Sequence, residues 1–82
     1  MADYELKFSV GEKGPTQTLP SFGKGAWTSD YKGTGLKVEM PTANAFQITA
    51  QEVGTYYFHL SLPPNFKEQP RTCLVKVLRA TL

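Results

Sequence analysis

Hydrophobic and polar residues alternate in short runs along the chain, with a period of two. The clearest run covers residues 55–62 and places four apolar or aromatic side chains on one side: Tyr56, Phe58, Leu60 and Leu62. Because successive side chains of a β-strand point to opposite faces, this spacing predicts a strand with one buried face.

Six further segments have the composition of strands and are separated by turn-forming residues, mostly glycine and proline. They cover residues 4–10, 16–19, 26–31, 36–40, 45–50 and 72 to about 80. Seven short strands spaced about 8–12 residues apart are typical of a β-sandwich or a small barrel. No segment places apolar residues at helical spacing over two turns. We therefore expect a single all-β domain over residues 1–82, with about seven short antiparallel strands and essentially no helix.

The last predicted strand is apolar on both sides. One face carries Cys73, Val75 and Val77, and the other carries Leu74 and Leu78 around Lys76. A strand with one solvated face is expected to be polar on that face. The sequence therefore predicts that Leu74 and Leu78 are covered by a partner subunit, a neighbouring domain or the chain's own first loop. A homo-oligomer formed through this strand is one version of that prediction.

Length and composition limit the classes of function. A chain of 82 residues forms one core and buries about 60–65 % of its surface, which leaves no deep substrate cavity. The net charge of +2 is too small to predict binding to duplex DNA, which calls for a clustered basic stripe. Cys73 is the only cysteine, so neither an intramolecular disulfide nor a cysteine-based metal site is predicted. No cofactor is expected.

The amino-terminal residues include two acids, Asp3 and Glu5, and no apolar run. They do not resemble a secretory signal, and no segment approaches the roughly 18 apolar residues of a membrane-spanning helix. The sequence therefore predicts a protein made in the cytoplasm without a signal peptide and not held in a membrane. Incorporation into a virion is one route by which such a protein leaves the cell, and excision from a longer chain gives the same features.

Candidate catalytic and metal-binding residues are few. His59 is the only histidine, and the period-two pattern places it on the face opposite Tyr56. Ser61 follows on the same face, but no third group lies nearby in the sequence to orient the imidazole ring. One histidine and one cysteine match no metal-ligand spacing. The glycine-rich segments 23–25 and 32–35 precede no helix, so hairpin turns explain them better than phosphate binding does. We expect no enzymatic activity.

Aromatic and basic residues are interleaved in two stretches. One contains Phe22, Lys24, Trp27, Tyr31 and Lys32, and the other contains Phe66, Lys67 and Arg71. Such a combination binds single-stranded nucleic acid by stacking on bases and contacting phosphates. Trp, Tyr, Phe and Arg also dominate protein–protein contacts. We favour protein contacts for the loop residues and expect Trp27 at the centre of the core.

Residues 52–58 resemble the corner of immunoglobulin-like domains, which reads Asp-x-Gly-x-Tyr-x-Cys; Glu52 replaces the acid and Phe58 replaces the cysteine. Residues 46–66 are similar in particular to bacterial and phage immunoglobulin-like repeats, in which the corner is followed by a strand and a proline–asparagine–aromatic turn. The resemblance implies a small immunoglobulin-like sandwich.

Four residues are then expected to be structural, namely Gly54, Tyr56, Phe58 and Trp27. Gly54 is expected to serve a tight turn. For Tyr56 two alternatives are open. Its hydroxyl bonds to backbone groups at the start of its strand while the ring enters the core, or the side chain is an ordinary core tyrosine.

The sequence thus predicts a non-enzymatic binding or structural module. The phage-type resemblance favours a virion accessory protein that decorates a capsid or associates with a tail. The expected contact residues are Phe66, Lys67 and Arg71 at a loop tip, Leu74 and Leu78 on the last strand, and Phe22, Lys24, Tyr57 and His59 elsewhere on the surface. One alternative is a small β-barrel that binds single-stranded nucleic acid through Phe22, Lys24, Trp27 and Tyr57. Another is a phage-encoded inhibitor of a host protein.

Overall fold

The structure is a computed structural model that describes residues 2–80. Its strands are β1 (Tyr4–Ser9), β2 (Gln17–Thr18), β3 (Thr28–Ser29), β4 (Leu36–Thr42), β5 (Ala45–Ala50), β6 (Gly54–Ser61) and β7 (Arg71–Leu78). One turn of 3-10 helix, η1 (Pro64–Phe66), lies between β6 and β7. The prediction of an all-β fold is confirmed. Within the described part of the chain, no helix has the length and apolar character needed to cross a bilayer.

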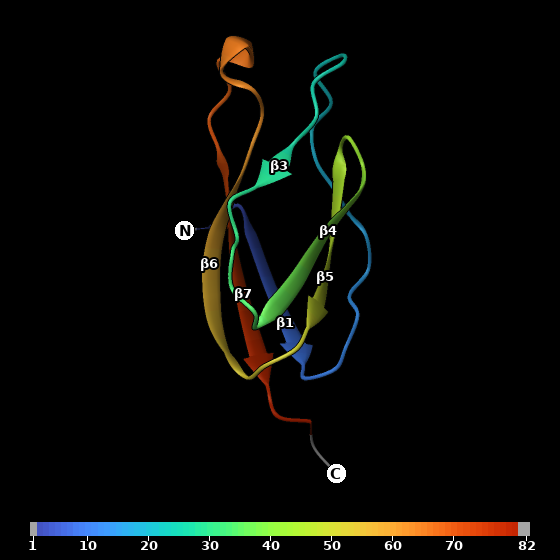
Figure 1. Ribbon diagram of the computed structural model, residues 1–82, viewed down its shortest axis with the longest axis vertical. Coiled ribbons are helices and arrows are strands. Elements are labelled where there is room, and N and C mark those ends of the chain that lie inside the picture. The colour runs from blue at the N-terminus through green and yellow to red at the C-terminus, as the bar shows by residue number, and fades with distance from the viewer. Residues whose placement is uncertain (1, 81–82) are drawn as a thin grey trace.

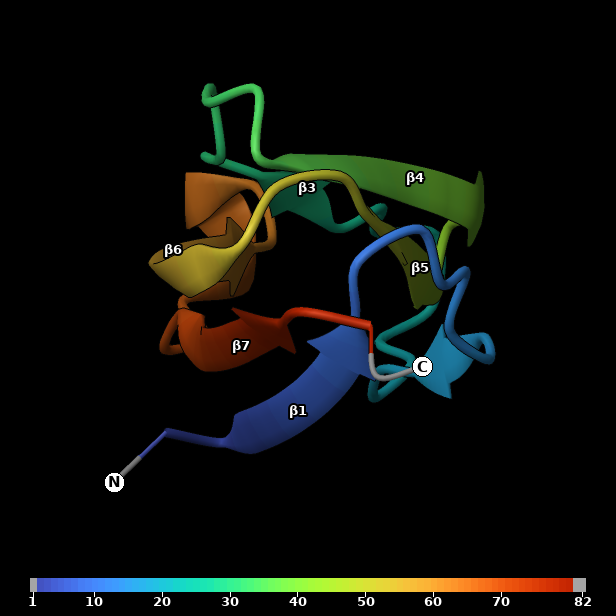
Figure 2. The ribbon, with the colours of Figure 1, turned by 90° about the horizontal axis from the view of Figure 1, so that it is seen from below.

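The strands form two sheets that face each other (Figure 1). One sheet has the order β1-β7-β6-β3 and the other has the order β2-β5-β4, and Figure 2 shows them in end view. After β1 the chain crosses from the first sheet to the second. There the Gly11 amide donates to the Ala50 carbonyl at 2.8 Å, and the Gly14 amide donates to the Ile48 carbonyl at 2.8 Å. The first loop therefore joins the two sheets along one side of the sandwich.

β1 and β7 pair in parallel, with Tyr4 opposite Cys73 and Ser9 opposite Leu78. The remaining strand pairs are antiparallel. The prediction of antiparallel strands was therefore wrong at this one pairing. Parallel neighbours require a long connection, and here the connection is the whole chain between the first and last strands. The alternation of hydrophobic and polar residues within β1 or β7 does not indicate that these two strands pair with each other.

The predicted bounds of the five long strands agree with the structure to within two residues. β2 and β3 are shorter than predicted, at two residues each. The residues beside them bond outside the ladders, because the Leu19 amide donates to the Asn44 carbonyl at 2.7 Å and the Trp27 amide donates to the Ala43 carbonyl at 3.0 Å. Carbonyl groups of the turn between β4 and β5 therefore accept the hydrogen bonds of these two amides.

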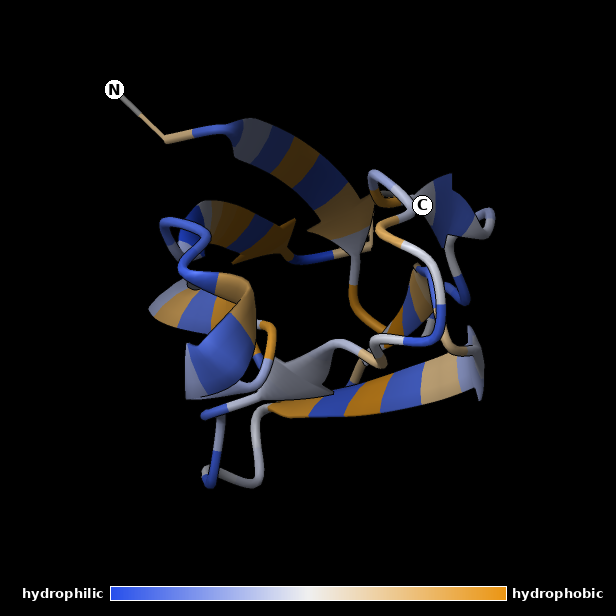
Figure 3. Ribbon diagram, turned by 90° about the horizontal axis from the view of Figure 1, so that it is seen from above, coloured by the Kyte–Doolittle hydropathy of each residue, from blue (hydrophilic) through white to orange (hydrophobic). Residues whose placement is uncertain are grey.

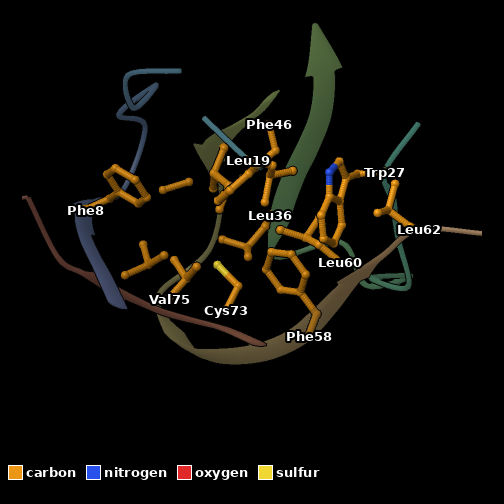
Figure 4. Close-up of a cluster of buried hydrophobic side chains, with 13 residues drawn as sticks. Phe8, Leu19, Trp27, Leu36, Phe46, Phe58, Leu60, Leu62, Cys73 and Val75 are labelled. Atoms are coloured by element: carbon orange, nitrogen blue, oxygen red, sulfur yellow. The ribbon is translucent and has the colours of Figure 1, made fainter. Parts of the chain in front are cut away.

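The core lies between the sheets. Hydrophobic and hydrophilic bands alternate along β1 and β4 (Figure 3), as expected for strands with one buried face. Five inward side chains of β6 and β7 are at most 2 % exposed, namely Phe58, Leu60, Cys73, Val75 and Val77. Trp27 lies at one end of the cluster and Phe8 at the other (Figure 4). Phe58 and Trp27 are thus core residues, but Trp27 lies at one end of the core and not at its centre as predicted.

A contact around Tyr56 joins two connections at the opposite end from η1. The Tyr56 hydroxyl donates to the Glu52 carbonyl at 2.7 Å, so of the two alternatives for this residue the backbone-bonding one is correct. Its ring packs on Gly35, where a Cβ would overlap the ring, and edge-on against Tyr31 with centroids 6.1 Å apart. The Gly35 carbonyl accepts from the amides of Gln51 and Glu52. The β3–β4 loop and the β5–β6 turn are thereby fixed to each other.

Candidate functional site

Three connections meet at one end of the sandwich (Figure 1): the β2–β3 loop, the β4–β5 turn, and the β6–β7 loop with η1. We call this the loop end. The β2–β3 loop is bound to the β4–β5 turn by the two backbone bonds of Leu19 and Trp27. In addition, the Asn44 side-chain amide donates to the Ser21 hydroxyl at 3.4 Å. These bonds hold the two connections as one unit.

Trp27 and Arg71 connect the loop end to the core. Trp27 is 2 % exposed, and its indole N–H donates to the Pro20 carbonyl at 2.9 Å. The Arg71 guanidinium lies 5.4 Å from the centroid of the Trp27 ring, which is a cation–π distance. Its Nη1 donates to the Gln69 carbonyl, and its Nη2 forms an ion pair with Glu68 at 3.3 Å. Arg71, which the sequence placed at a contact tip, is therefore occupied by contacts within the chain.

Phe66 is similarly occupied. Its ring packs on Gly25 and Leu62. A Cβ added to Gly25 would lie 2.7 Å from Phe66 Cζ and 3.0 Å from Leu62 Cδ2. The ring thus approaches the backbone of the β2–β3 loop as closely as a glycine allows. Phe66 anchors the β6–β7 loop, and its partial burial limits what it offers to a partner.

The remaining side chains of the loop end are presented to solvent. Lys67 is exposed and has left-handed backbone angles (φ 54°, ψ 31°) as it ends η1. Such angles are uncommon for a side-chain-bearing residue. Lys24 is exposed, and Phe22 is one of the exposed large hydrophobic residues, at 36 %. One aromatic ring and two cations therefore project from connections that are bonded or packed to one another.

A second surface is the solvent side of the sheet β1-β7-β6-β3, which we call the outer face. Tyr57 is 59 % exposed there and Leu78 is 50 % exposed, while Leu74 is half-buried. The first loop does not cover these side chains, because Gly11 and Gly14 bond to β5 in the other sheet. Of the covers predicted for Leu74 and Leu78, that one is wrong. A partner subunit or a neighbouring domain stays a prediction.

His59 on β6 pairs with Asp30, which directly follows β3. The His59 amide donates to Asp30 Oδ1 at 2.7 Å, and Nδ1 of the ring lies 3.1 Å from Oδ2. The backbone hydrogen bond from His59 is the main cause that lowers the pKa of the Asp30 carboxyl. The His59 ring also meets Tyr57 edge-on at 5.4 Å. A group that orients this imidazole therefore exists, although it is distant in sequence.

The groups around this pair in the described residues differ from those of a nucleophile–base pair. Within residues 2–80, no hydroxyl or thiol is hydrogen-bonded to the His59 ring. The Cys73 thiol is fully buried, and desolvation raises its pKa to about 12, which keeps it protonated and unreactive at neutral pH. The same residues contain no cluster of three His, Cys, Asp or Glu side chains suited to a metal ion. The Asp30–His59 pair is best explained as a link between β3 and β6.

The structure separates several residues that the sequence grouped together. Trp27 is buried and is not available to stack on a base, and Tyr57 lies on the outer face, whereas Phe22 and Lys24 lie in the β2–β3 loop. Sequence reasoning missed Asp30 and Gly25, whose partners lie 29 and 41 positions away (59 − 30 and 66 − 25). No local spacing signals either contact.

Comparison with protein-family models, curated proteins and solved structures finds no match.

Proposed function

We propose that the chain is a non-enzymatic binding module of the immunoglobulin-like type, which docks on a protein through its loop end. The observation that carries this proposal is a set of three connections joined by backbone hydrogen bonds and by the packing of Phe66 on Gly25, from which Phe22, Lys24 and Lys67 project. Loops held by a rigid sheet scaffold are the usual place for recognition. Preordered loops also lose little conformational entropy on binding.

The immunoglobulin-like assignment is supported by the strand order. Immunoglobulin sandwiches place their third, sixth and seventh strands in one sheet and their second, fourth and fifth strands in the other. The orders β7-β6-β3 and β2-β5-β4 have the same arrangement. β1 departs from it, because it pairs with β7, whereas the first strand of a constant-type domain lies in the sheet of the second, fourth and fifth strands. The Tyr56 bond to Glu52 corresponds to the tyrosine corner of that fold, with Trp27 buried beside the third strand.

Within this class we propose the role of a virion accessory protein, either on a capsid or on a tail. The support is the similarity of residues 46–66 to bacterial and phage immunoglobulin-like repeats. A phage-encoded inhibitor of a host protein would use the same docking chemistry on a different partner. The nucleic-acid alternative loses support from the burial of Trp27, since a stacking site requires an accessible ring.

On this proposal a phage encodes the chain, and the test uses that phage's virus particles, purified as heads and as detached tails. The protein should cosediment with one of them. The double change Phe22→Ala and Lys67→Glu should weaken that binding at least about tenfold, since truncating a central contact typically costs more than 1 kcal/mol. Lys37→Glu is the matched control and should bind as the wild type does. Lys37 is exposed near the start of β4 and does not belong to the loop end.

Two results separate the alternatives. Cosedimentation that is unaffected by the double change overturns docking through the loop end. Absence of cosedimentation with both heads and tails overturns the virion role. Binding of an oligothymidine that weakens steeply between about 50 and 200 mM salt would support the nucleic-acid alternative instead.

A further inference from the structure

The outer face carries two adjacent rows of side chains set by strand register. The first row runs across the strands through Glu5, Leu74 and Tyr57, and the second runs through Lys7, Lys76 and Thr55. The first row is acidic at its β1 end and apolar in its middle. The second row is basic on both β1 and β7. Each row therefore has the charge that the other row lacks.

The two lysines of the second row have no ion-pair partner within the described chain. Lys7 and Lys76 are direct neighbours in the parallel pairing, and like charges at such positions repel each other. The ion pairs of residues 2–80 involve other lysine, arginine and histidine side chains. A shallow groove of about 250 Å³ lies here and is lined by Glu5, Leu6, Lys7, Leu74 and Lys76. The groove is thus suited to an incoming carboxylate.

We infer that this groove receives Glu5 of a second copy of the chain, which gives a two-fold symmetric dimer through the outer face. Consider a two-fold axis that lies in the contact plane, crosses the strands and passes between the two rows. Each row of one copy then faces the other row of the second copy. Glu5 of each copy meets Lys7 and Lys76 of the other, and the same patch serves both copies, as an isologous contact requires.

The apolar side chains fit the same arrangement. Leu74 and Tyr57 lie at the middle of the contact, where they meet Lys76 and Thr55 of the second copy. The aliphatic stem of a lysine packs on apolar surface while its ammonium group reaches a carboxylate. Leu78 lies two residues beyond Lys76 and extends the contact along β7. The dimer therefore covers the residues whose exposure on the last strand is otherwise unexplained.

The size of the outer face predicts weak association. One further row lies on each side of these two, through Thr72 and His59 and through Ser9 and Leu78. Four strands about 4.8 Å apart and these four rows span roughly 15 by 20 Å, or about 300 Å². This is well below the area of about 800 Å² per partner in a standard interface. The molar mass measured by sedimentation equilibrium should therefore rise from 9.1 kDa toward twice that value between about 10 μM and 1 mM protein.

A charge exchange tests the geometry. Glu5→Lys makes both rows basic, and Lys7→Glu with Lys76→Glu makes both rows acidic. Each variant should remain monomeric over a concentration range in which the wild type dimerises. In a dimer of either variant, the rows that face each other across the contact carry the same charge and repel. A mixture of the two variants should form a heterodimer at least as readily as the wild type forms its dimer, since every repelled pair becomes an attracted one.

The control pair has the same net charges away from the outer face, with Glu39→Lys on β4 in one protein, and Lys37→Glu on β4 plus Lys13→Glu in the β1–β2 loop in the other. Each control protein should dimerise like the wild type. A wild type that stays monomeric at 1 mM overturns the inference, as does a dimer that the Glu5 and Lys76 changes leave intact. The outcome is independent of the loop end, because none of these residues lies there.

Discussion

Gly35 shows how a single missing side chain supports the sandwich. The Tyr56 ring occupies the space that a Cβ on Gly35 would need, and from this position its hydroxyl reaches the Glu52 carbonyl. Tyr31 packs on the same ring, and its own hydroxyl accepts from the Leu36 amide at 3.1 Å. Two tyrosines thereby tie the β3–β4 loop to β4 and β6. The sequence drew attention to Tyr56 but not to the glycine under its ring.

Gly35→Ala should lower the free energy of unfolding by about 1–3 kcal/mol, the usual cost of inserting a methyl group into a packed site. The measurement is urea denaturation followed by circular dichroism. The same change in a Tyr56→Ala background is the control, because removal of the ring makes space for the methyl group. The loss should be clearly smaller there, since residues in contact are not additive. Equal losses in the two backgrounds would mean that the ring is not what excludes a side chain at position 35.

At the scale of elements, β3 is, with β2, one of the two shortest strands of the sandwich. It has two residues, and its pairs are Thr28 with Ser61 and Ser29 with Leu60. Asp30 adds a backbone bond from its amide to the His59 carbonyl at 3.0 Å and accepts the His59 amide through its carboxylate. The Asp30 carboxylate therefore accepts a backbone hydrogen bond of β6 that the short ladder of β3 leaves without a carbonyl partner.

Asp30→Ala should destabilise the protein in a pH-dependent way. The bond from the His59 amide lowers the pKa of the Asp30 carboxyl below its ordinary value of 3.8, so its contribution is fully present above that pH. The contribution is lost as pH falls through the lowered pKa. The free energy of unfolding of the variant should be lower than that of the wild type by about 1 kcal/mol or less at pH 7, because the carboxylate is half exposed and screened.

The measurement is the urea midpoint of both proteins between pH 7 and pH 2. The gap should narrow below pH 4 as Asp30 becomes protonated. Asp3, whose pKa is also lowered, is present in both proteins and cancels in the difference. A gap that stays constant down to pH 2 would show that the charge of the carboxylate does not hold β3.

The parts of the fold that local alternation encodes were predictable, and the parts that depend on pairing were not. The buried face of β6 and the bounds of β5 follow from period-two spacing alone. The parallel pairing of β1 with β7 and the Asp30–His59 contact depend on which strands become neighbours. The same limit applied to the loop end. Phe66 reads as an exposed tip residue until the loop between β2 and β3 is placed under its ring.

For the molecule as a whole, the loop end and the sheets should unfold together. A domain of 82 residues has a free energy of unfolding of roughly 4–12 kcal/mol, so no part of it has much stability of its own. Trp27 is bound to the loop end through Pro20 and Arg71, and its ring is part of the core. Its fluorescence therefore reports on both regions. The signal should follow the same denaturation curve as circular dichroism at the far-ultraviolet wavelengths of the sheets.

Phe66→Ala and Phe22→Ala together show which aromatic ring supports the structure and which is free for a partner. Phe66 is partly buried on Gly25 and Leu62, so its removal should cost about 2 kcal/mol, roughly half the loss for a fully buried phenylalanine. The curves for fluorescence and circular dichroism should shift by the same amount. Phe22 is exposed, and its removal should change stability by less than about 0.5 kcal/mol. Curves that separate in Phe66→Ala would show that the loop end melts before the sheets, and docking would then include the cost of ordering it.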